Sequence, residues 1–359
     1  MKILYDHQIF SYQERIGGVT RYFYEIMKRL PLENWETSVK YSNNPLFKEL
    51  AEAKSYDYKY FFPNINLPRK GRLMLELGKP YSRKIIKKND YDILHLTHYE
   101  SYAINDTSKP IVITYHDKLF SSYAYNKRTE SEQRKCLEKA AAVVCISENT
   151  KKDFLSVFDY PEDKIHVIYH GINTLPVGKK LDKKEKYILF VGGRASYKNF
   201  DNLARAFSIL SKKDPDLYLY CTGKAFSENE LELLEQLGIG DKTKAKYVSD
   251  FELADLYANA ECFVFPSKYE GFGMPLLEAM NQNCPVCCSN AHCFPEIVND
   301  AALLFNPDKP EDIANKINQI INNESLREEL IEKGNERKNY FSWEKSVKQH
   351  IELYESLIQ

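Results

Sequence analysis

The sequence predicts an α/β protein built from two doubly wound parallel sheets, one in each half of the chain. With 359 residues, the chain exceeds the size at which a single hydrophobic core is typical, so two domains are expected. Short apolar runs of strand length alternate with longer segments of helical periodicity. This alternation favours parallel strands joined by helical crossovers, with ligands at the carboxyl ends of the strands.

Five apolar runs in the first half of the chain are expected to form strands. They are Ile3–Tyr5, Ile93–Leu96, Ile111–Tyr115, Val143–Ile146 and Val167–Tyr169. A charged stretch from Gly178 to Lys186 then interrupts the pattern, as linkers do. We therefore place the first domain at residues 1–178.

The second half repeats the alternation. Its predicted strands are Tyr187–Val191, Leu217–Cys221, Lys246–Val248, Cys262–Phe265 and Pro285–Cys288, with helical patterns at Asn202–Leu210, Glu228–Leu237 and Glu252–Ala258. The tail from Trp343 to Ile358 also has helical periodicity. The second domain is therefore expected at residues 179–340, followed by a C-terminal helix within residues 341–359.

Composition and charge exclude several classes of protein. A net charge of −1 gives no electrostatic reason to expect nucleic-acid binding. The N-terminus turns polar after a few residues, without a signal-peptide core, and no apolar run reaches the roughly 18 residues that span a membrane. Eight cysteines without a secretion signal indicate free thiols in a reducing compartment. We expect a cytoplasmic protein.

The segment EGFGMPLLE, from Glu270 to Glu278, is the most informative stretch. It follows the predicted strand Cys262–Phe265, and Pro275–Met280 has the pattern of a helix start. Its two glycines let backbone approach a ligand, and the helix start presents free N–H groups to an anion. Two carboxylates beside such a loop suit a ligand with both hydroxyls and phosphates, such as a sugar nucleotide. A plain strand-to-helix connection with a favourable glutamate in its first turn fits the same pattern.

A second motif, GRASYKN, runs from Gly193 to Asn199 after another predicted strand. Arg194 and Lys198 lie four residues apart on a strand-to-helix turn, near enough to hold one diphosphate. An exposed Arg/Lys pair is usually a solvated face, but its place at a strand end favours a functional role.

Together these motifs resemble those of the retaining nucleotide-sugar glycosyltransferases of family 4, and the similarity covers nearly the whole chain. It continues in Gly17-Gly18 with Arg21, His116-Asp117, Ile146-Ser147, Tyr247-Val248-Ser249-Asp250 and Phe294-Pro295-Glu296. The resemblance implies the GT-B architecture, two Rossmann-like domains facing across a cleft. It also implies that the last helix crosses back to the N-terminal domain.

The resemblance implies roles for individual residues. The catalytic set is His116, Arg194, Lys198 and Glu270: the two cations hold the departing diphosphate, Glu270 lies against the donor sugar, and His116 bonds the sugar or the acceptor. Donor-binding positions are Gly17, Gly18, Gly193, Tyr247, Val248, Ser249, Phe272, Gly273, Met274 and Glu278, the last on the ribose. Arg21 and Asp117 lie on the acceptor side. Reaction at the front face is implied, with the leaving diphosphate assisting deprotonation of the acceptor.

No metal or cofactor is expected. The pairs Asp90/Asp92 and Asp214/Asp216 mimic metal ligands but precede strands, at the sheet edge opposite to ligands, and indicate turns. The cysteines and histidine between Cys284 and Cys293 have zinc-like spacing, but Pro285–Cys288 has the pattern of a buried strand. Neither a P-loop nor a GxGxxG fingerprint is present, which weakens ATPase and dehydrogenase interpretations.

Residues 69–88 form a basic segment that is separate from the motifs above and indicates a different kind of interaction. Eight Lys and Arg side chains fall together with only Glu76 opposing them, interleaved with aliphatic residues. Such a segment can hold a protein peripherally on anionic lipid at the inner face of a membrane. A solvated helix is an equally good interpretation.

The sequence thus predicts a retaining, metal-independent glycosyltransferase that moves a hexose from a nucleoside diphosphate sugar to a glycan or lipid-linked glycan, in cell-surface polysaccharide synthesis. GDP-mannose is slightly favoured, by frequency in the family alone. The alternatives are a synthase or phosphorylase of storage-glucan or disaccharide type, and a non-catalytic sugar-nucleotide-binding partner subunit. The presence of both motif cations and both glutamates argues against a degenerate subunit.

Overall fold

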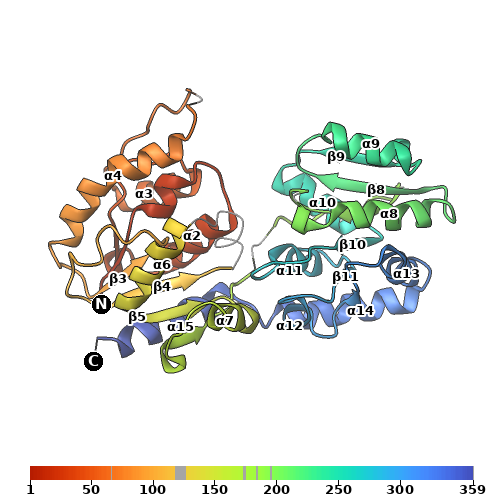
Figure 1. Cartoon of the computed structure of the whole chain (residues 1–359). Helices are drawn as coiled ribbons and strands as arrows, with labels where there is room; N and C mark the ends of the chain where they lie inside the picture. Colours follow the sequence, from red (N-terminus) through yellow and green to blue (C-terminus); the bar gives the residue numbers. More distant parts are fainter. Residues whose placement is uncertain (66, 118–126, 173–174, 183–184, 195, 359) are drawn as a thin grey trace. The chain divides into compact units, whose positions relative to one another are not determined.

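The computed structural model describes residues 1–65, 67–117, 127–172, 175–182, 185–194 and 196–358, which form two compact units. One unit comprises Met1–Gly171 and Ser342–Gln359, and the other comprises Ile172–Phe341. Each unit contains a six-stranded sheet flanked by helices (Figure 1). All described strand pairings are parallel.

The strand order in each sheet reverses once. The first sheet has the order β2-β1-β3-β4-β5-β6, with β1 (Ile3–Tyr5), β2 (Trp35–Thr37), β3 (Ile93–Leu96), β4 (Ile111–Tyr115), β5 (Ala140–Cys145) and β6 (Ile165–Val167). The second has the order β12-β11-β10-β7-β8-β9, with β7 (Lys186–Phe190), β8 (Leu217–Thr222), β9 (Thr243–Lys246), β10 (Cys262–Phe265), β11 (Val286–Ser289) and β12 (Leu303–Phe305). The reversals lie between β1 and β3 and between β7 and β10, the positions where doubly wound sheets bind ligands.

The helices belong to the two units as follows. The first unit contains α1 (Gln8–Tyr12), α2 (Gly18–Arg29), α3 (Pro45–Lys54), α4 (Lys70–Ile86), α6 (Lys127–Lys139), α7 (Glu148–Leu155) and α15 (Trp343–Ser356). The second contains α8 (Phe200–Ser211), α9 (Glu228–Gln236), α10 (Asp250–Asn259), α11 (Met274–Asn281), α12 (Phe294–Val298), α13 (Pro310–Ile321) and α14 (Glu324–Lys338). Short 3₁₀ turns lie at Leu32–Asn34, Glu162–Lys164, Ser196–Lys198 and Gly240–Lys242.

The predicted fold class is confirmed. Strands β1, β3, β4 and β10 have the predicted bounds, because central parallel strands are buried on both faces and appear as continuous apolar runs. The edge strands β2 and β12 were not predicted, since three residues are too few to establish a period. Strand β9 spans Thr243–Lys246, so the predicted strand at Lys246–Val248 is wrong beyond its first residue.

The C-terminal helix α15 packs on α2 of the first unit, as predicted. Polar side chains bond across this buried contact. The hydroxyl of Tyr22 lies 2.7 Å from Nε2 of His350, and the hydroxyl of Tyr354 lies 2.7 Å from Nδ1 of His95. All four residues are fully buried, so these hydrogen bonds favour a single position of α15 on the first unit.

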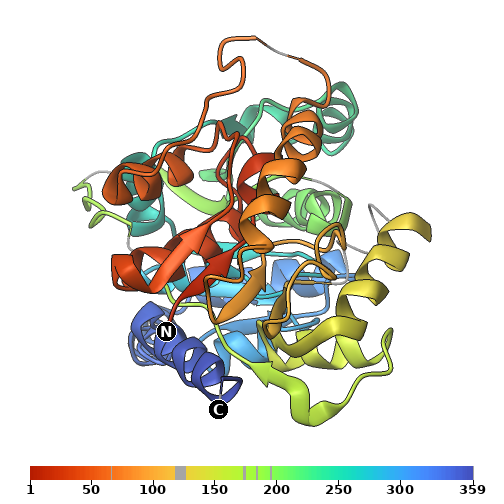
Figure 2. The same ribbon diagram turned by 90° about the vertical axis from the view of Figure 1, so that its left-hand side faces the viewer.

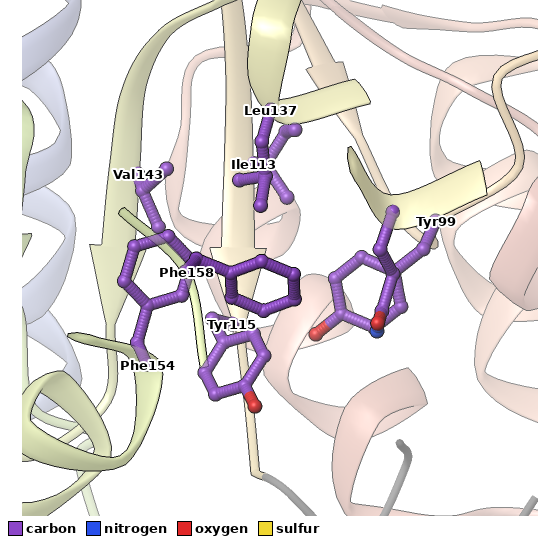
Figure 3. A pocket seen from close by; sticks show the side chains of 8 residues that line it. Tyr99, Ile113, Tyr115, Leu137, Val143, Phe154 and Phe158 are labelled. Atoms are coloured by element: carbon purple, nitrogen blue, oxygen red, sulfur yellow. The ribbon is translucent and has the colours of Figure 1, made fainter. Parts of the chain in front are cut away.

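A narrow apolar gap, without room for a water molecule, lies in the core of the first unit (Figure 3). Gln133 on α6 is 2% exposed, and neither atom of its amide has a hydrogen-bond partner within the described ranges. The rest of the lining is apolar or aromatic: Tyr99, Ile113, Tyr115, Leu137, Val143, Phe154 and Phe158. This lining identifies a packing gap in the core and offers little to a polar ligand.

Gly171 ends the first segment of its unit and packs against the residue that begins α15. A Cβ atom on Gly171 would lie 2.1 Å from the backbone nitrogen of Trp343 and 2.5 Å from Cγ of its indole. The indole also stacks on His170, with ring centroids 5.6 Å apart. Only glycine permits this approach of two backbone segments.

Replacing Gly171 by alanine should therefore destabilise the protein, because the backbone of Trp343 would have to shift. Overpacking of this kind costs about 1–3 kcal/mol, which corresponds to a fall in Tm of roughly 2–10 °C. Gly240→Ala is the matched control, since a Cβ there meets no described heavy atom within 4 Å. Thermal unfolding of the two variants measures the difference, and equal Tm values would contradict the packing argument.

Candidate active site

The loop after β10 carries Glu270 and ends at the glycine that begins α11. Gly273 has a φ of +95° and is the N-cap of this helix, which has Pro275 in its first turn. A Cβ at Gly273 would lie 2.9 Å from Cδ1 of Leu276 and 3.3 Å from Cε1 of Phe294. Backbone conformation and packing therefore both require glycine here.

The loop after β7 contains the second motif. Gly192 has a φ of +113°, and its N–H donates to Oγ1 of Thr222 at 3.1 Å. Asn199, at the end of this loop, donates from Nδ2 to the carbonyl of Pro266 at 3.1 Å. This bond ties the loop after β7 to the loop after β10.

Lys198 and Glu270 form an ion pair between these two loops, through Nζ and Oε1. Each side chain is 17% exposed, so the pair is largely desolvated and still reachable from solvent. Because β7 and β10 are neighbours at the reversal of strand order, their loops meet at the carboxyl edge of the sheet. The structure thus brings together one cation and one carboxylate of the predicted catalytic set.

Arg194 lies apart from this pair and makes its own contacts. Its Nε donates to Oε1 of Glu230 at 2.7 Å, Nη2 donates to the carbonyls of residues 224 and 225, and the guanidinium covers the ring of Phe226. The side chain is 5% exposed. Burial of Glu230 acts to raise its pKa, but hydrogen bonds from Arg194 and Ser227 hold the pKa below its usual value. In this structure Arg194 fastens the segment that precedes α9.

Glu278 is half-buried on α11, beside Tyr257 of α10. Burial, and then the charge of Glu278 and a hydrogen bond to it, raise the pKa of Tyr257 well above its usual value. Phe272 is buried, with its ring edge-on to Phe341, and Met274 is half-buried at the first position of α11.

Residues 247–249 lie between β9 and α10. Tyr247 is 68% exposed, and Val248 is half-buried. Ser249 caps α10: its hydroxyl accepts from the N–H of Glu252, whose carboxylate accepts from the N–H of Ser249 at 2.8 Å. The spacing of a serine and a glutamate three residues later is a capping box, and this sequence signal was overlooked.

The predicted residues of the first unit lie at or after the ends of β1 and β4. Gly17 is the extended N-cap of α2, and Arg21 is half-buried in the first turn. A Cβ on Gly18 would meet no described heavy atom within 4 Å, so this helix start has room for a ligand. Asp117 is half-buried next to His116.

His116 follows β4 and is 6% exposed. Burial, and then the neighbouring His170 and His98, lower its pKa well below the usual value, so the ring is neutral at neutral pH. Its Nε2 has no hydrogen-bond partner within the described part of the chain. A buried polar atom without a partner is costly, and a ligand hydroxyl would satisfy this one.

Within residues 69–88 only Glu76 is acidic, but carboxylates from outside the segment also oppose its cations. Three further carboxylates pair with it in the folded unit: Glu14 with Lys70, Glu100 with Arg72 and Lys79, and Asp106 with Arg83 and Lys87. Arg69, Lys84 and Lys88 have no ion-pair partner among the described residues. The ion pairs leave a smaller positive charge than the sequence indicated.

Other polar side chains considered in the sequence have structural neighbours. Asp90 and Asp92 bond Lys2, and Asp214 pairs with Lys186. All eight cysteines are buried and have reduced thiols. Within the described ranges, no three His, Cys, Asp or Glu side chains are arranged to hold a metal ion, and no helix is long and apolar enough to cross a membrane.

Sequence reasoning missed Thr222, Asn199 and Cys293, which hold the two loops. Cys293 lies at the start of α12, with Sγ 3.1 Å from the carbonyl oxygen of Glu270. Asn199 closes the GRASYKN motif and Cys293 belongs to the cysteines with zinc-like spacing, but neither pattern indicates a contact with a segment that is distant in sequence.

Two doubly wound parallel sheets, with glycine turns and a Lys/Glu pair at the strand reversal of the second, fit the GT-B architecture of nucleotide-sugar transferases. Two family models match consecutive parts of the chain: Glycosyltransferase Family 4 at residues 16–174 and Glycosyl transferases group 1 at residues 172–337. The chain belongs to the family 4 glycosyltransferases, a retaining family.

Similar proteins of known name agree with this membership. O-antigen chain mannosyltransferase B of Escherichia coli is 27% identical over 99% of this chain and 100% of its own length. O-antigen chain mannosyltransferase RfbU of Salmonella typhimurium is 30% identical over 51% of this chain and 52% of its own. The crystal structure of Anabaena HepE with UDP and glucose superposes with a TM-score of 0.78 at 19% identity, covering 99% of this chain and 100% of that one. This last match supports the fold alone.

Alanine at Gly273 and at Gly193 should have different effects. Gly273→Ala strains a backbone at positive φ and crowds Leu276, so it should lower Tm by several degrees, at a cost of about 1–3 kcal/mol. Gly193→Ala should keep Tm, because a Cβ there meets no described heavy atom within 4 Å, while weakening donor binding by filling space that a ligand would use.

Thermal unfolding and donor titration of both variants measure these effects. A Gly193→Ala variant that binds donor normally would contradict its place in the donor site.

Proposed function

We propose that this protein transfers mannose from GDP-mannose to a glycan or lipid-linked glycan in cell-surface polysaccharide synthesis, with retention of configuration and without a metal ion. The observation that carries the transfer chemistry is the Lys198–Glu270 pair at the strand reversal of the second unit. The choice of mannose is supported by relatives named as O-antigen chain mannosyltransferases, one of them similar along its whole length.

A nucleotide-sugar donor could replace both partners of this ion pair, one for each side chain. The diphosphate oxygens would accept hydrogen bonds from the ammonium of Lys198, and the sugar hydroxyls would donate to the carboxylate of Glu270. The bond between the anomeric carbon and the diphosphate oxygen then breaks, and the acceptor oxygen bonds to that carbon on the same face. The acceptor proton passes to the departing diphosphate. A preorganised cation stabilises the negative charge that develops on that group.

The other predicted residues have supporting roles in this proposal. Glu278 holds the ribose, and the neutral ring of His116 bonds the donor sugar or the acceptor through Nε2. Arg194 and Lys198 are not equivalent cations for the diphosphate. Glu230 and two backbone carbonyls already accept hydrogen bonds from the guanidinium of Arg194. Its contribution to the diphosphate would come through the loop that it fastens, or through Nη1.

A non-catalytic sugar-nucleotide-binding subunit is the alternative from another class. Turnover separates the two, since a binding subunit would bind donor without consuming it. A sucrose-phosphate synthase superposes with a TM-score of 0.76, but at 18% identity this similarity supports only the shared fold.

We also propose that the protein contacts an anionic membrane peripherally. Both the loop before α4 and the basic segment 69–88 would take part in this contact. This loop projects from its unit in Figures 1 and 2, and Tyr60, Phe62 and Ile65 on it are about half exposed. The buried ammonium of Lys70 bonds the carbonyls of Phe62 and Ile65 and pairs with Glu14, so the loop is held in place.

The nearby face of α4 supports the same contact. Leu73 and Leu77 continue the exposed apolar surface, and Arg69, Lys84 and Lys88 supply cations. Apolar side chains with a basic fringe suit an interface with anionic headgroups.

Lys198→Ala should lower turnover of GDP-mannose by about a hundredfold, the scale for losing one preorganised charge-stabilising group. Lys268→Ala is the matched control, because Lys268 lies on the neighbouring loop but pairs outward with Asp308. Steady-state kinetics with GDP-mannose and UDP-glucose would measure both the loss and the donor preference. A folded Lys198→Ala enzyme with near-normal turnover would refute the assignment, and a preference for UDP-glucose would refute the donor.

Replacing Phe62 and Ile65 together by serine should reduce binding to vesicles containing anionic lipid, because two apolar side chains no longer enter the interface. Leu231→Ser, an equally exposed aliphatic residue on α9, should bind as the unmodified protein does. Co-sedimentation with anionic and neutral vesicles measures both. Equal binding by all three proteins would exclude this loop from the membrane contact.

A further inference from the structure

Cys293 contacts the backbone of the loop that carries Glu270. Its Sγ lies 3.1 Å from the carbonyl oxygen of Glu270 and 3.2 Å from that of Phe272. These two carbonyls flank Gly271, whose backbone is not restricted by a side chain. One thiol therefore lies between the two backbone segments that determine where the carboxylate of Glu270 points.

The residues on either side of Cys293 face the same loop. His292 has a φ of +51°, and its ring centroid lies 3.8 Å from that of Tyr269. Phe294 packs where a side chain at Gly273 would be, 3.3 Å from the Cβ position. Three consecutive residues of the β11–α12 connection thus support the loop over residues 269–273.

The opposite side of the loop is held by the segment after β7. The N–H of Lys268 donates to the carbonyl of Tyr197 at 2.8 Å, and Asn199 bonds the carbonyl of Pro266. The loop is therefore supported from both neighbouring strands, with Glu270 between the two attachments.

The thiol of Cys293 is protonated at neutral pH. Burial, and then the charges of Glu270 and Glu296, raise its pKa well above the usual value. A protonated thiol is a weak donor with one proton, which can reach either carbonyl. It is also fully buried, so solvent does not compete for this proton.

We propose that Cys293 is a positioning residue for glycosyl transfer, whose thiol holds the loop so that Glu270 meets the reacting sugar. The inference rests on the role proposed for Glu270. Displacement of a reacting group by about 1 Å can lower a rate by around a hundredfold, so loss of one backbone attachment is expected to affect the chemical step. Donor affinity should change less, because Lys198 and Glu278 remain in place.

The test compares Cys293→Ala, Cys293→Ser and Cys287→Ala in the full-length enzyme. Cys293→Ala should lower kcat roughly tenfold, with a donor KM within about twofold of the original, on the scale of one lost hydrogen bond. Cys293→Ser should restore most of kcat, because a hydroxyl donates to the same carbonyls. Cys287→Ala removes an equally buried thiol from β11 within the core cluster around Val264, and should leave kcat unchanged.

Two results would overturn the proposal. Equal kcat for Cys293→Ala and Cys287→Ala would show that the thiol does not position the loop. Equal loss in Cys293→Ala and Cys293→Ser would show that sulfur packing matters and that the donated hydrogen bond does not. Lys198→Ala, assayed in parallel, separates these outcomes from failure of the proposed function, because normal turnover in that variant would refute the function itself.

Discussion

The reversal of strand order between β7 and β10 is the constraint on which the candidate donor site depends. At this point neighbouring strands send their connections to opposite sides of the sheet, and doubly wound sheets bind ligands outside the carboxyl edge at such a reversal. Lys198 and Glu270 are 72 positions apart in sequence and meet only here. Gly192 and Gly273, both at positive φ, allow the chain to turn out of β7 and into α11 beside the pair.

Backbone contacts keep these two loops in place. Thr222, Asn199 and Cys293 each bond an N–H or carbonyl group of a loop, from three different elements. Bonds to backbone restrict where a loop runs and leave its side chains available to a ligand. The side chain of Arg194 is less available to a ligand. A carboxylate and two backbone carbonyls accept hydrogen bonds from it, so it helps to hold a loop in place.

The core of the first unit contains a hydrogen-bonded polar cluster beside a histidine nitrogen that has no described partner. Beneath α15, Tyr22, His95, His350 and Tyr354 exchange hydrogen bonds in a fully buried cluster. The ring of His116 lies edge-on to Tyr22, with centroids 5.0 Å apart, yet its Nε2 has no partner within the described ranges. Other buried polar atoms of this unit also lack a partner among the described residues, including the amide of Gln133 and the indole nitrogens of Trp35 and Trp343. His116 follows the carboxyl end of β4, on the side of a doubly wound sheet where ligands bind.

Although the packing of the last helix on the first unit followed from the family resemblance, the sequence by itself determined the fold class, the central strands, the helical character of the tail and the two motif loops. Each of these depends on local pattern: continuous apolar runs for β3, β4 and β10, and glycine or proline at the turn into α11. Only the tertiary structure decided which charges meet. Arg72 pairs with Glu100 over 28 positions and Arg194 with Glu230 over 36, so the basic segment is partly neutralised and one motif arginine is held by a carboxylate. A periodic pattern gives information only about residues a few positions apart in the same segment. Ion pairs and thiol–carbonyl contacts join segments that are distant in sequence and meet only in the folded protein.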